Sequence, residues 1–249
     1  MKSSAASPLL LNCQFFSQEE YISHLARALH EPTLTHIVTL NAEMVVEAEH
    51  NQAFKQAVQQ AELVIPDGSS ILWARNFLTK KRQSVMLSLF MHLFSKEKPI
   101  TGIESVFSLC DIAQEHNAAI YILGGTPLQA QGTLSVLQKK YPEVRIRITN
   151  ENLPTDTQPG ILLVAYGAPK QTLWIERHRK TLTEKGIRIA IGVGGAFAMI
   201  SGQLPRAPKF LRTLHLEWLW RLILEPRRIG RIWNAVVVFP RIIQKGYPH

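Results

Sequence analysis

The chain contains little cysteine and no long apolar run, and both absences limit what kind of protein it can be. Its 249 residues include two cysteines, Cys13 and Cys110, which lie far apart and lack the spacing of metal ligands. A reducing compartment is therefore expected, without a framework of disulfides. No apolar run approaches the roughly 18–20 residues of a membrane-spanning helix, and the N-terminus lacks the full apolar segment of a secretory signal. Together these absences predict a cytoplasmic protein.

The motifs of several common enzyme classes are also missing. The first predicted strand is not followed by a GxGxxG motif with an acidic ribose partner, which argues against a nicotinamide-dependent oxidoreductase. A GxSxG motif and a locally supported Cys–His pair are absent, so covalent hydrolase chemistry lacks support. The histidine, cysteine and acidic residues do not have the spacing of a metal site, so neither a metal nor another cofactor is expected.

Positive charge is concentrated at the C-terminal end of the chain. The net charge is +9 and the isoelectric point is about 9.7. Residues 205–249 hold nine Lys and Arg against two Glu, which gives this segment a net +7. Its partner should be anionic, either a membrane surface, a phosphorylated substrate or nucleic acid. The aliphatic residues at 222–224 and 236–238 suit lipid better, so no nucleic-acid partner is predicted.

Apolar, strand-like runs alternate with helical patterns along most of the chain. The runs lie at 36–40, 63–65, 119–123, 144–148, 161–165 and 187–191, and the helical patterns at roughly 17–30, 43–61, 69–78, 103–117, 126–141 and 169–185. This alternation predicts an α/β protein with a Rossmann-like, mainly parallel sheet flanked by helices. We assign residues 1–204 to this α/β domain and residues 205–249 to a basic helical appendage.

Polar and small residues gather directly after five of the predicted strands, in loops at 39–43, 66–68, 123–127, 165–171 and 192–195. Ligands of open α/β sheets bind outside the carboxyl ends of the strands, so these loops predict one site. Asp67 in such a loop fits a general base, but Asp is also a common helix cap. Asn41 allows the same two interpretations, as a ligand of sugar or phosphate or as a cap.

Two glycine-rich turns are candidates for phosphate binding. Gly124 and Gly125 follow one strand and open a helix, and Gly194 and Gly195 follow another strand. Glycine lets backbone N–H groups approach a phosphate closely, and a helix N-terminus favours negative charge. A tight strand-to-helix turn would explain either loop equally well.

The basic appendage has the composition of a helix at a membrane interface. Trp218 and Trp220 stand beside Arg221 in a stretch of helical spacing. The alternative is an ordinary C-terminal helix that packs on its own domain. Pro226 should divide the segment into two helices, because proline disrupts a helix interior.

Taken in order, the motifs resemble those of one bacterial family. They are Asn41-Ala42-Glu43, Pro66-Asp67-Gly68, Thr101-Gly102, Gly124-Gly125, Gly167-Ala168-Pro169-Lys170-Gln171, Gly192-Val193-Gly194-Gly195, Arg206-Ala207-Pro208 and Glu217-Trp218-Leu219-Trp220-Arg221-Leu222. The sequence resembles the WecG/TagA/CpsF family, glycosyltransferase family 26. The resemblance implies an inverting enzyme that moves an N-acetylmannosamine-type or related sugar from a UDP-sugar to a polyprenyl-pyrophosphate-linked sugar. Its product would feed a cell-surface polysaccharide such as teichoic acid, capsule or exopolysaccharide.

The resemblance also implies roles for individual residues. Asp67 matches the proposed general base, Thr39 and Asn41 match active-site positions, and Gln171 matches a residue near the donor diphosphate. The expected substrate-binding residues are Gly68, Gly124, Gly125, Gln171, Gly194, Gly195, Arg212, Arg221, Arg228 and Arg231. The four arginines belong to the appendage, which docks on the inner face of the cell membrane in the family. An arginine that stabilises the leaving UDP would make a metal unnecessary.

Three departures from the family pattern stand out. Ala198 occupies a position that is acidic in many members, and Thr172 replaces a usual Glu. The insert at 80–98 holds an apolar run at 85–94 between basic residues, which we interpret as a second contact with membrane or acceptor lipid. Two alternatives stay open at this point. One is a non-catalytic, membrane-associated nucleotide-binding scaffold, and the other is a homo-oligomer that covers the apolar face of the appendage.

Overall fold

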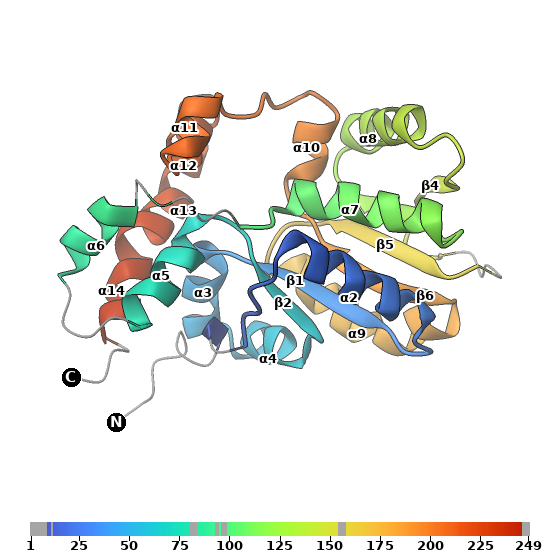
Figure 1. Ribbon diagram of the computed structural model, residues 1–249, viewed down its shortest axis with the longest axis horizontal. Helices are drawn as coiled ribbons and strands as arrows, with labels where there is room; N and C mark the ends of the chain where they lie inside the picture. The colour runs from blue at the N-terminus through green and yellow to red at the C-terminus, as the bar shows by residue number, and fades with distance from the viewer. Residues whose placement is uncertain are drawn as a thin grey trace.

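A parallel β-sheet between two layers of helices forms the centre of the molecule (Figure 1). The computed structural model describes residues 9–10, 12–79, 84–92, 95, 99–153 and 158–245. Within these ranges, six strands pair in the order β2-β1-β6-β5-β3-β4, and every pairing is parallel. The predicted α/β fold with its mainly parallel sheet is confirmed.

The elements agree closely with the predicted pattern. The strands are β1 (Thr35–Leu40), β2 (Leu63–Pro66), β3 (Ala119–Gly124), β4 (Ile146–Thr149), β5 (Gly160–Ala165) and β6 (Ile187–Gly192). The helices that precede the C-terminal segment are α2 (Gln18–His30), α3 (Ala42–His50), α4 (Gln52–Gln60), α5 (Ser69–Thr79), α6 (Val85–His92), α7 (Gly102–Glu115), α8 (Pro127–Lys140), α9 (Lys170–Glu184) and α10 (Ala196–Ile200). Most predicted bounds lie within a few residues of these.

The helical pattern predicted over 43–61 forms two helices, which meet at Asn51. The Asn51 side chain caps α4 by accepting a hydrogen bond from the Phe54 N–H at 3.0 Å. Its main-chain N–H donates to the Glu47 carbonyl at 2.9 Å and closes α3. Asparagine is a favourable N-cap, and this local bond interrupts a stretch whose apolar spacing continues on both sides.

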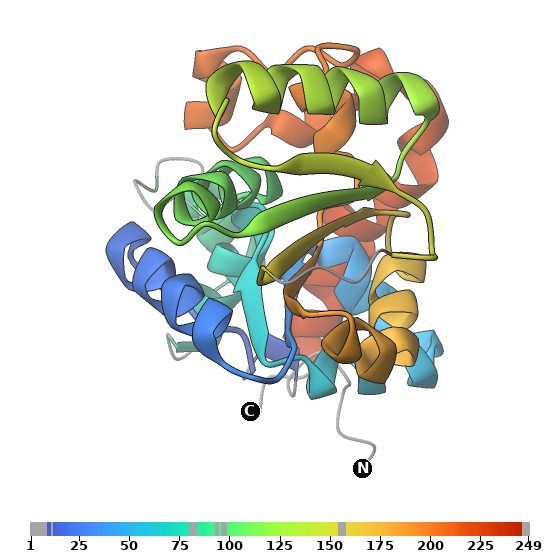
Figure 2. The same ribbon diagram turned by 90° about the vertical axis from the view of Figure 1, so that its right-hand side faces the viewer.

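Strand side chains alternate between the two faces of the sheet, as the pleat requires. In β5, Ile161 and Leu163 lie in the apolar cluster with α2, α7 and α8, whereas Leu162 and Val164 pack with α9. Figure 2 shows the twisted sheet with helices on both sides. Because both faces are covered, the carboxyl ends of the strands are the natural place for a ligand.

The C-terminal segment is helical and is broken at Pro226, as predicted, but it forms more than the two helices expected, because two short helices precede Pro226 and further helices follow it. Its elements are α11 (Lys209–Thr213), α12 (Glu217–Leu224), the 3-10 turn η1 (Pro226–Arg228), α13 (Ile229–Trp233), the π-helical turn η2 (Asn234–Val238) and α14 (Phe239–Lys245). Proline lacks the N–H that a continuing α-helix would need, so α12 ends before it.

The two ends of this segment pack very differently. None of the residues of α11 and α12 is buried. In α14, by contrast, Phe239 and Ile243 are fully buried in the cluster that holds Val45 of α3 and Trp73 of α5. Residues 205–249 are therefore anchored in the α/β domain by their last helix, and the exposed part of the appendage is its first half.

The apolar run predicted at 85–94 forms α6 as far as His92, and residues 93–94 lie outside the described part of the chain. Helix α6 packs beside α5 at the end of the molecule that also carries α11–α14 (Figure 1). Among the described residues, no helix has both the length and the apolar character required to cross a bilayer.

Candidate active site

Two adjoining cavities open beside the carboxyl ends of β1 and β2. The first has a volume of about 160 Å³ and reaches the loop after β6, and the second has a volume of about 520 Å³ and reaches α11 and α12. The residues that border both cavities are Asn41, Glu43, Asp67, Thr101, Arg206, Glu217, Arg221 and Arg228. The cavities therefore meet along a boundary that carries one aspartate and several arginines.

Asp67 stands directly after β2 and borders both cavities. Its main-chain N–H donates to the Leu40 carbonyl at 2.7 Å, which ties the strand exit to β1. Its carboxylate accepts a hydrogen bond of 3.4 Å from the N–H of Gly102 at the start of α7. The carboxylate thus contacts α7, a helix that begins 35 residues later in the chain, and it borders the cavities beside the start of that helix.

The surroundings of Asp67 favour its protonated form. Burial raises the pKa of Asp67 above its ordinary value, and the charge of Arg221 and the Gly102 hydrogen bond oppose this rise. The negative charges of Glu217 and Glu104 raise the pKa further. A carboxylate with a raised pKa is a stronger base than an exposed one, so this environment suits a group that accepts a proton from a substrate.

Thr39 and Asn41 have structural bonds as well as places at the cavities. The Thr39 hydroxyl donates to the Gly192 carbonyl at 3.0 Å and joins β1 to β6. The Asn41 side chain accepts from the Met44 N–H at 3.1 Å, so it caps α3. Thr39 borders the first cavity and Asn41 borders both. The cap interpretation of Asn41 holds, and it leaves the residue at the edge of the site.

Gln171 connects two of the loops that form the first cavity. Its Oε1 accepts hydrogen bonds from the N–H of Gly167 at 3.0 Å and from the N–H of Gly194 at 3.1 Å. A side chain at position 192 would collide with it, because a Cβ there would lie 2.5 Å from its Nε2. Gln171 therefore holds the loops after β5 and β6 together, and Gly194 and Gly195 both border the cavity.

The four predicted arginines all reach the cavities, although they come from different helices. Arg221 and Arg228 border both cavities, Arg231 borders the first and Arg212 borders the second. The turn at Pro226 redirects the chain, so that arginines before and after it converge. Arg231 pairs with Glu43 at 2.9 Å. Burial lowers the pKa of Arg228, whose guanidinium also lies 3.3 Å from Glu225.

The remaining predicted glycines fall in different places. Gly68 borders the second cavity and has a φ of +96°, a conformation that glycine adopts readily. Gly124 and Gly125 border neither cavity. Gly124 ends β3 and Gly125 follows it, and β5 and β6 separate this strand from β1. A Cβ at position 124 would lie 2.8 Å from the Tyr166 ring. Their turn is therefore not brought together with Asp67.

Sequence reasoning did not select Glu104 and Arg206 as site residues. Their ion pair of 3.4 Å joins the start of α7 to the segment before α11. Glu104 also completes a capping box with Thr101, because its carboxylate accepts a hydrogen bond from the Thr101 N–H at 3.0 Å. The signal was present in the sequence, since a Thr followed three residues later by a Glu is typical of a capping box.

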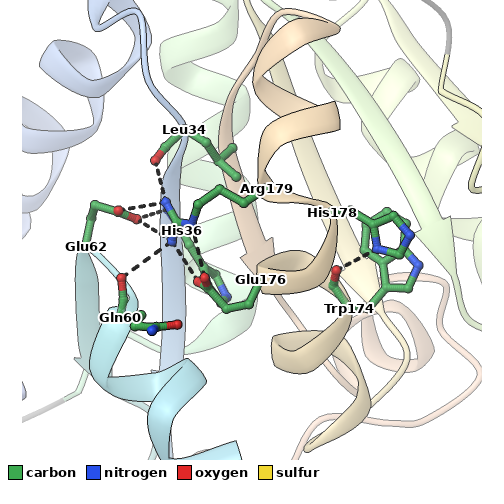
Figure 3. A network of polar contacts seen from close by, with 8 residues as sticks. All are labelled: Leu34, His36, Gln60, Glu62, Trp174, Glu176, His178 and Arg179. Atoms are coloured by element: carbon green, nitrogen blue, oxygen red, sulfur yellow. Dashed lines mark hydrogen bonds and ion pairs between the residues drawn. The ribbon is translucent and has the colours of Figure 1, made fainter. Parts of the chain in front are cut away.

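A second polar network lies at the opposite edge of the sheet (Figure 3). His36 in β1 contacts Glu176 of α9 at 2.5 Å, and Glu176 also accepts from Arg179 at 2.7 Å. Arg179 pairs with Glu62 at 2.7 Å. Burial on its own raises the pKa of Glu176, but the hydrogen bonds from His36 and Arg179 outweigh it and lower the pKa to about 2. These charges compensate one another and stabilise the fold.

Across the described ranges, histidine, cysteine and acidic side chains do not form a group of three or more suited to a metal ion. The site consists of the desolvated carboxylate of Asp67, the two loops that Gln171 joins by hydrogen bonds, and the arginines of the C-terminal segment. This arrangement at the carboxyl end of an open parallel sheet is typical of an α/β enzyme, and its arginines suit an anionic ligand.

The chain matches the model of the Glycosyl transferase WecG/TagA/CpsF family over residues 9–247, and it belongs to this family. It is a glycosyltransferase, and the resemblance drawn from its sequence motifs is confirmed. A relative from Bacillus spizizenii is 25% identical over 240 residues, which cover 92% of this chain and 85% of the relative. A relative from Staphylococcus aureus is 28% identical over 220 residues, which cover 84% of this chain and 80% of the relative. Both relatives are named N-acetylglucosaminyldiphosphoundecaprenol N-acetyl-beta-D-mannosaminyltransferase.

Proposed function

We propose that this chain transfers an N-acetylmannosamine-type sugar from a UDP-sugar to a sugar linked to polyprenyl pyrophosphate. Transfer proceeds with inversion at the anomeric carbon, and the product serves the synthesis of a cell-surface polysaccharide. The names of the two relatives support the sugar and the lipid-linked acceptor. The observation that carries the proposal is the position of Asp67 and Arg221, which both border the two cavities.

In this proposal each cavity receives one substrate. The first cavity takes the reacting end of the donor, beside the loops that Gln171 holds together. The second cavity takes the acceptor sugar and its pyrophosphate, since Lys209 and Arg212 supply positive charge there. Because guanidinium and ammonium groups bind phosphate strongly, these side chains suit a diphosphate.

Asp67 acts as the general base at the boundary of the cavities. Its carboxylate accepts the proton of the acceptor hydroxyl while that oxygen attacks the anomeric carbon. The bond from the anomeric carbon to the diphosphate oxygen breaks on the opposite face, and UDP leaves with the bonding electrons. One attack from the face opposite the leaving group inverts the configuration.

Arginines of the C-terminal segment stabilise the charge that develops on the leaving UDP. Arg221 and Arg228 are best placed, since both border the two cavities. Fixed cations in a desolvated site stabilise a developing anion strongly, so the transfer needs no metal ion. We further propose that the basic C-terminal segment attaches the enzyme peripherally to the anionic inner face of the cell membrane.

Acceptor-dependent release of UDP tests the proposal. Purified protein would be incubated with a panel of UDP-sugars and polyprenyl-pyrophosphate-linked N-acetylglucosamine, with and without EDTA. We expect release with UDP-N-acetylmannosamine, a product of inverted anomeric configuration, and an unchanged rate in EDTA. Binding of UDP without turnover of any donor would contradict the transferase and support a nucleotide-binding scaffold, and loss of activity in EDTA would contradict the role of the arginines.

A further inference from the structure

Helix α6 exposes large apolar side chains while it buries a polar one. Met86, Leu87, Phe90 and Met91 are 77%, 54%, 59% and 52% exposed. Ser88 is buried on the inner face, where its hydroxyl accepts from the Trp73 indole N–H at 3.0 Å and donates to the Val85 carbonyl at 2.9 Å. Val85 and Leu89 also pack against the core, so α6 carries apolar residues on its outward side as well as on its inward side.

This arrangement fixes α6 to the domain with Met86, Leu87, Phe90 and Met91 outward. The indole of Trp73 is fully buried in the core, so its bond to Ser88 holds the helix in one rotation about its axis. Contiguous exposed apolar side chains on a soluble protein mark a surface that binds a partner or a membrane.

The C-terminal end of α6 lies next to the second cavity. The imidazole of His92 stacks on that of His215, with ring centroids 4.8 Å apart. His215 also bonds to the Ser95 carbonyl at 3.0 Å and borders the second cavity, as does Pro99. The C-terminal end of α6 is thus in contact with the segment that joins α11 to α12, and Figure 1 shows these helices at one end of the molecule.

More exposed apolar side chains lie on the other side of that contact. Phe210 of α11 is 63% exposed, and Trp218 of α12, which borders the second cavity, is 36% exposed. The same C-terminal segment carries a net +7. Apolar side chains and positive charge therefore occur together near the second cavity, and this combination binds an anionic lipid surface.

We propose that α6 inserts its apolar face into the anionic leaflet of the membrane and seats the second cavity against the bilayer. This role of α6 rests on the proposed function in one respect, since a lipid-linked acceptor can reach the cavity only where the cavity meets the membrane. The charge of the C-terminal segment selects a lipid surface as the partner over another apolar protein surface. The contact formed by α6 is distinct from that of the C-terminal helices, because it comes from a different part of the chain.

Vesicle flotation of the full-length protein tests this role. The variant Met86→Glu/Phe90→Glu would be compared with wild type on phosphatidylglycerol–phosphatidylcholine vesicles. Leu128→Glu is the matched control, because Leu128 is 75% exposed on α8, a helix that lies apart from α6 in Figure 1. We expect at least a tenfold loss of bound protein for the double variant, no loss for the control, and equal melting temperatures for all three.

Two further outcomes would overturn the proposal. Equal flotation of the double variant and wild type would remove α6 from the membrane contact. Equal flotation together with the loss of a dimer in sedimentation would assign the face to a second copy of the chain. The result does not depend on turnover, because flotation uses neither donor nor acceptor. If the enzyme is active, the double variant should keep its rate on a short-chain, water-soluble acceptor and lose rate on an acceptor embedded in vesicles.

Discussion

The amino ends and the carboxyl ends of the parallel strands define two edges of the sheet, and each edge holds a partly buried carboxylate. The surroundings shift the pKa values of these two carboxylates in opposite directions. At the amino edge, Glu176 receives hydrogen bonds from His36 and Arg179, and its pKa falls to about 2 (Figure 3). At the carboxyl edge, burial raises the pKa of Asp67, and one long hydrogen bond and the charge of Arg221 only partly oppose it. The negative charge of Glu176 is therefore compensated by its partners, whereas that of Asp67 is compensated only in part.

This difference separates a structural network from a reactive site. A carboxylate whose pKa is lowered is a weak base and contributes to stability through its partners. A carboxylate whose pKa is raised costs stability when it is ionised, but it accepts a proton more readily. The comparison predicts that a substitution at Asp67 lowers the rate more than the stability. A substitution at Glu176 should lower the stability more than the rate.

The largest effect on rate should come from Asp67→Asn. Loss of a general base lowers kcat by about 10²–10⁴-fold. The folded state should not lose stability at neutral pH, because a group with a raised folded pKa destabilises the fold once it is ionised, and the amide removes that charge. UDP release and thermal unfolding would be measured on the same preparation. If the variant were as fast as wild type, Asp67 would have only a structural role.

Arg221→Gln should give the next largest effect, a fall in kcat of about 10–10²-fold from weaker stabilisation of the leaving group. It should also move the acidic limb of the pH–rate profile to higher pH. The base works when deprotonated, and Arg221 opposes the rise of the Asp67 pKa, so its removal lets that pKa rise further. Arg227→Gln is the control, since Arg227 is exposed in the same segment and borders neither cavity. A lower rate without a shift of the limb would mean that Arg221 acts on the substrate alone.

At the other edge, Glu176→Gln should affect stability and leave the rate per folded molecule unchanged. Its side chain is 12% exposed, so the cost lies between those of surface and buried ion pairs, at about 2 kcal/mol in the free energy of unfolding. The lowered pKa means that this contribution is present above pH 4.5 and is lost as the pH falls toward about 2. Denaturant unfolding at neutral and acidic pH measures both quantities. A loss that does not shrink in acid would show that packing, and not charge, is responsible.

The sheet and the edge that holds the cavities could be predicted from the sequence, because buried parallel strands are nearly continuous apolar runs and ligands bind at their carboxyl ends. The order of strands across the sheet could not be predicted in this way. Gly124 follows a strand just as Asp67 does, but β5 and β6 separate its strand from β1. The distance between loops depends on that order, which arises from long-range packing.

The C-terminal segment shows a second limit of the sequence pattern. Its basic residues predicted an anionic partner, and Pro226 predicted a break, but neither indicated which helix enters the core. Phe239 and Ile243 are buried because α14 packs against α3 and α5, elements at least 160 positions earlier in the chain (239 − 79). The convergence of Arg221 and Arg228 on the same cavities likewise depends on the turn at Pro226, whose direction is set by this anchoring.

The smallest predicted effect gives the sharpest comparison of the two edges, because it uses two glutamates of similar exposure. Glu62 is 41% exposed in its pair with Arg179, and Glu104 is 46% exposed in its pair with Arg206. Replacing either by Gln should cost less than about 1 kcal/mol, since exposed ion pairs contribute little. Gln also preserves the capping box at Thr101.

Of these two glutamate variants, only Glu104→Gln should change the pH–rate profile. Its negative charge raises the pKa of Asp67, so its removal should lower that pKa and move the acidic limb to lower pH. This direction is opposite to that expected for Arg221→Gln, and Glu62→Gln should leave the limb in place. Opposite shifts from the two neighbours would identify the titrating group as Asp67 without altering the base itself. If both glutamate variants moved the limb equally, the group that limits the rate in acid would lie elsewhere in the molecule.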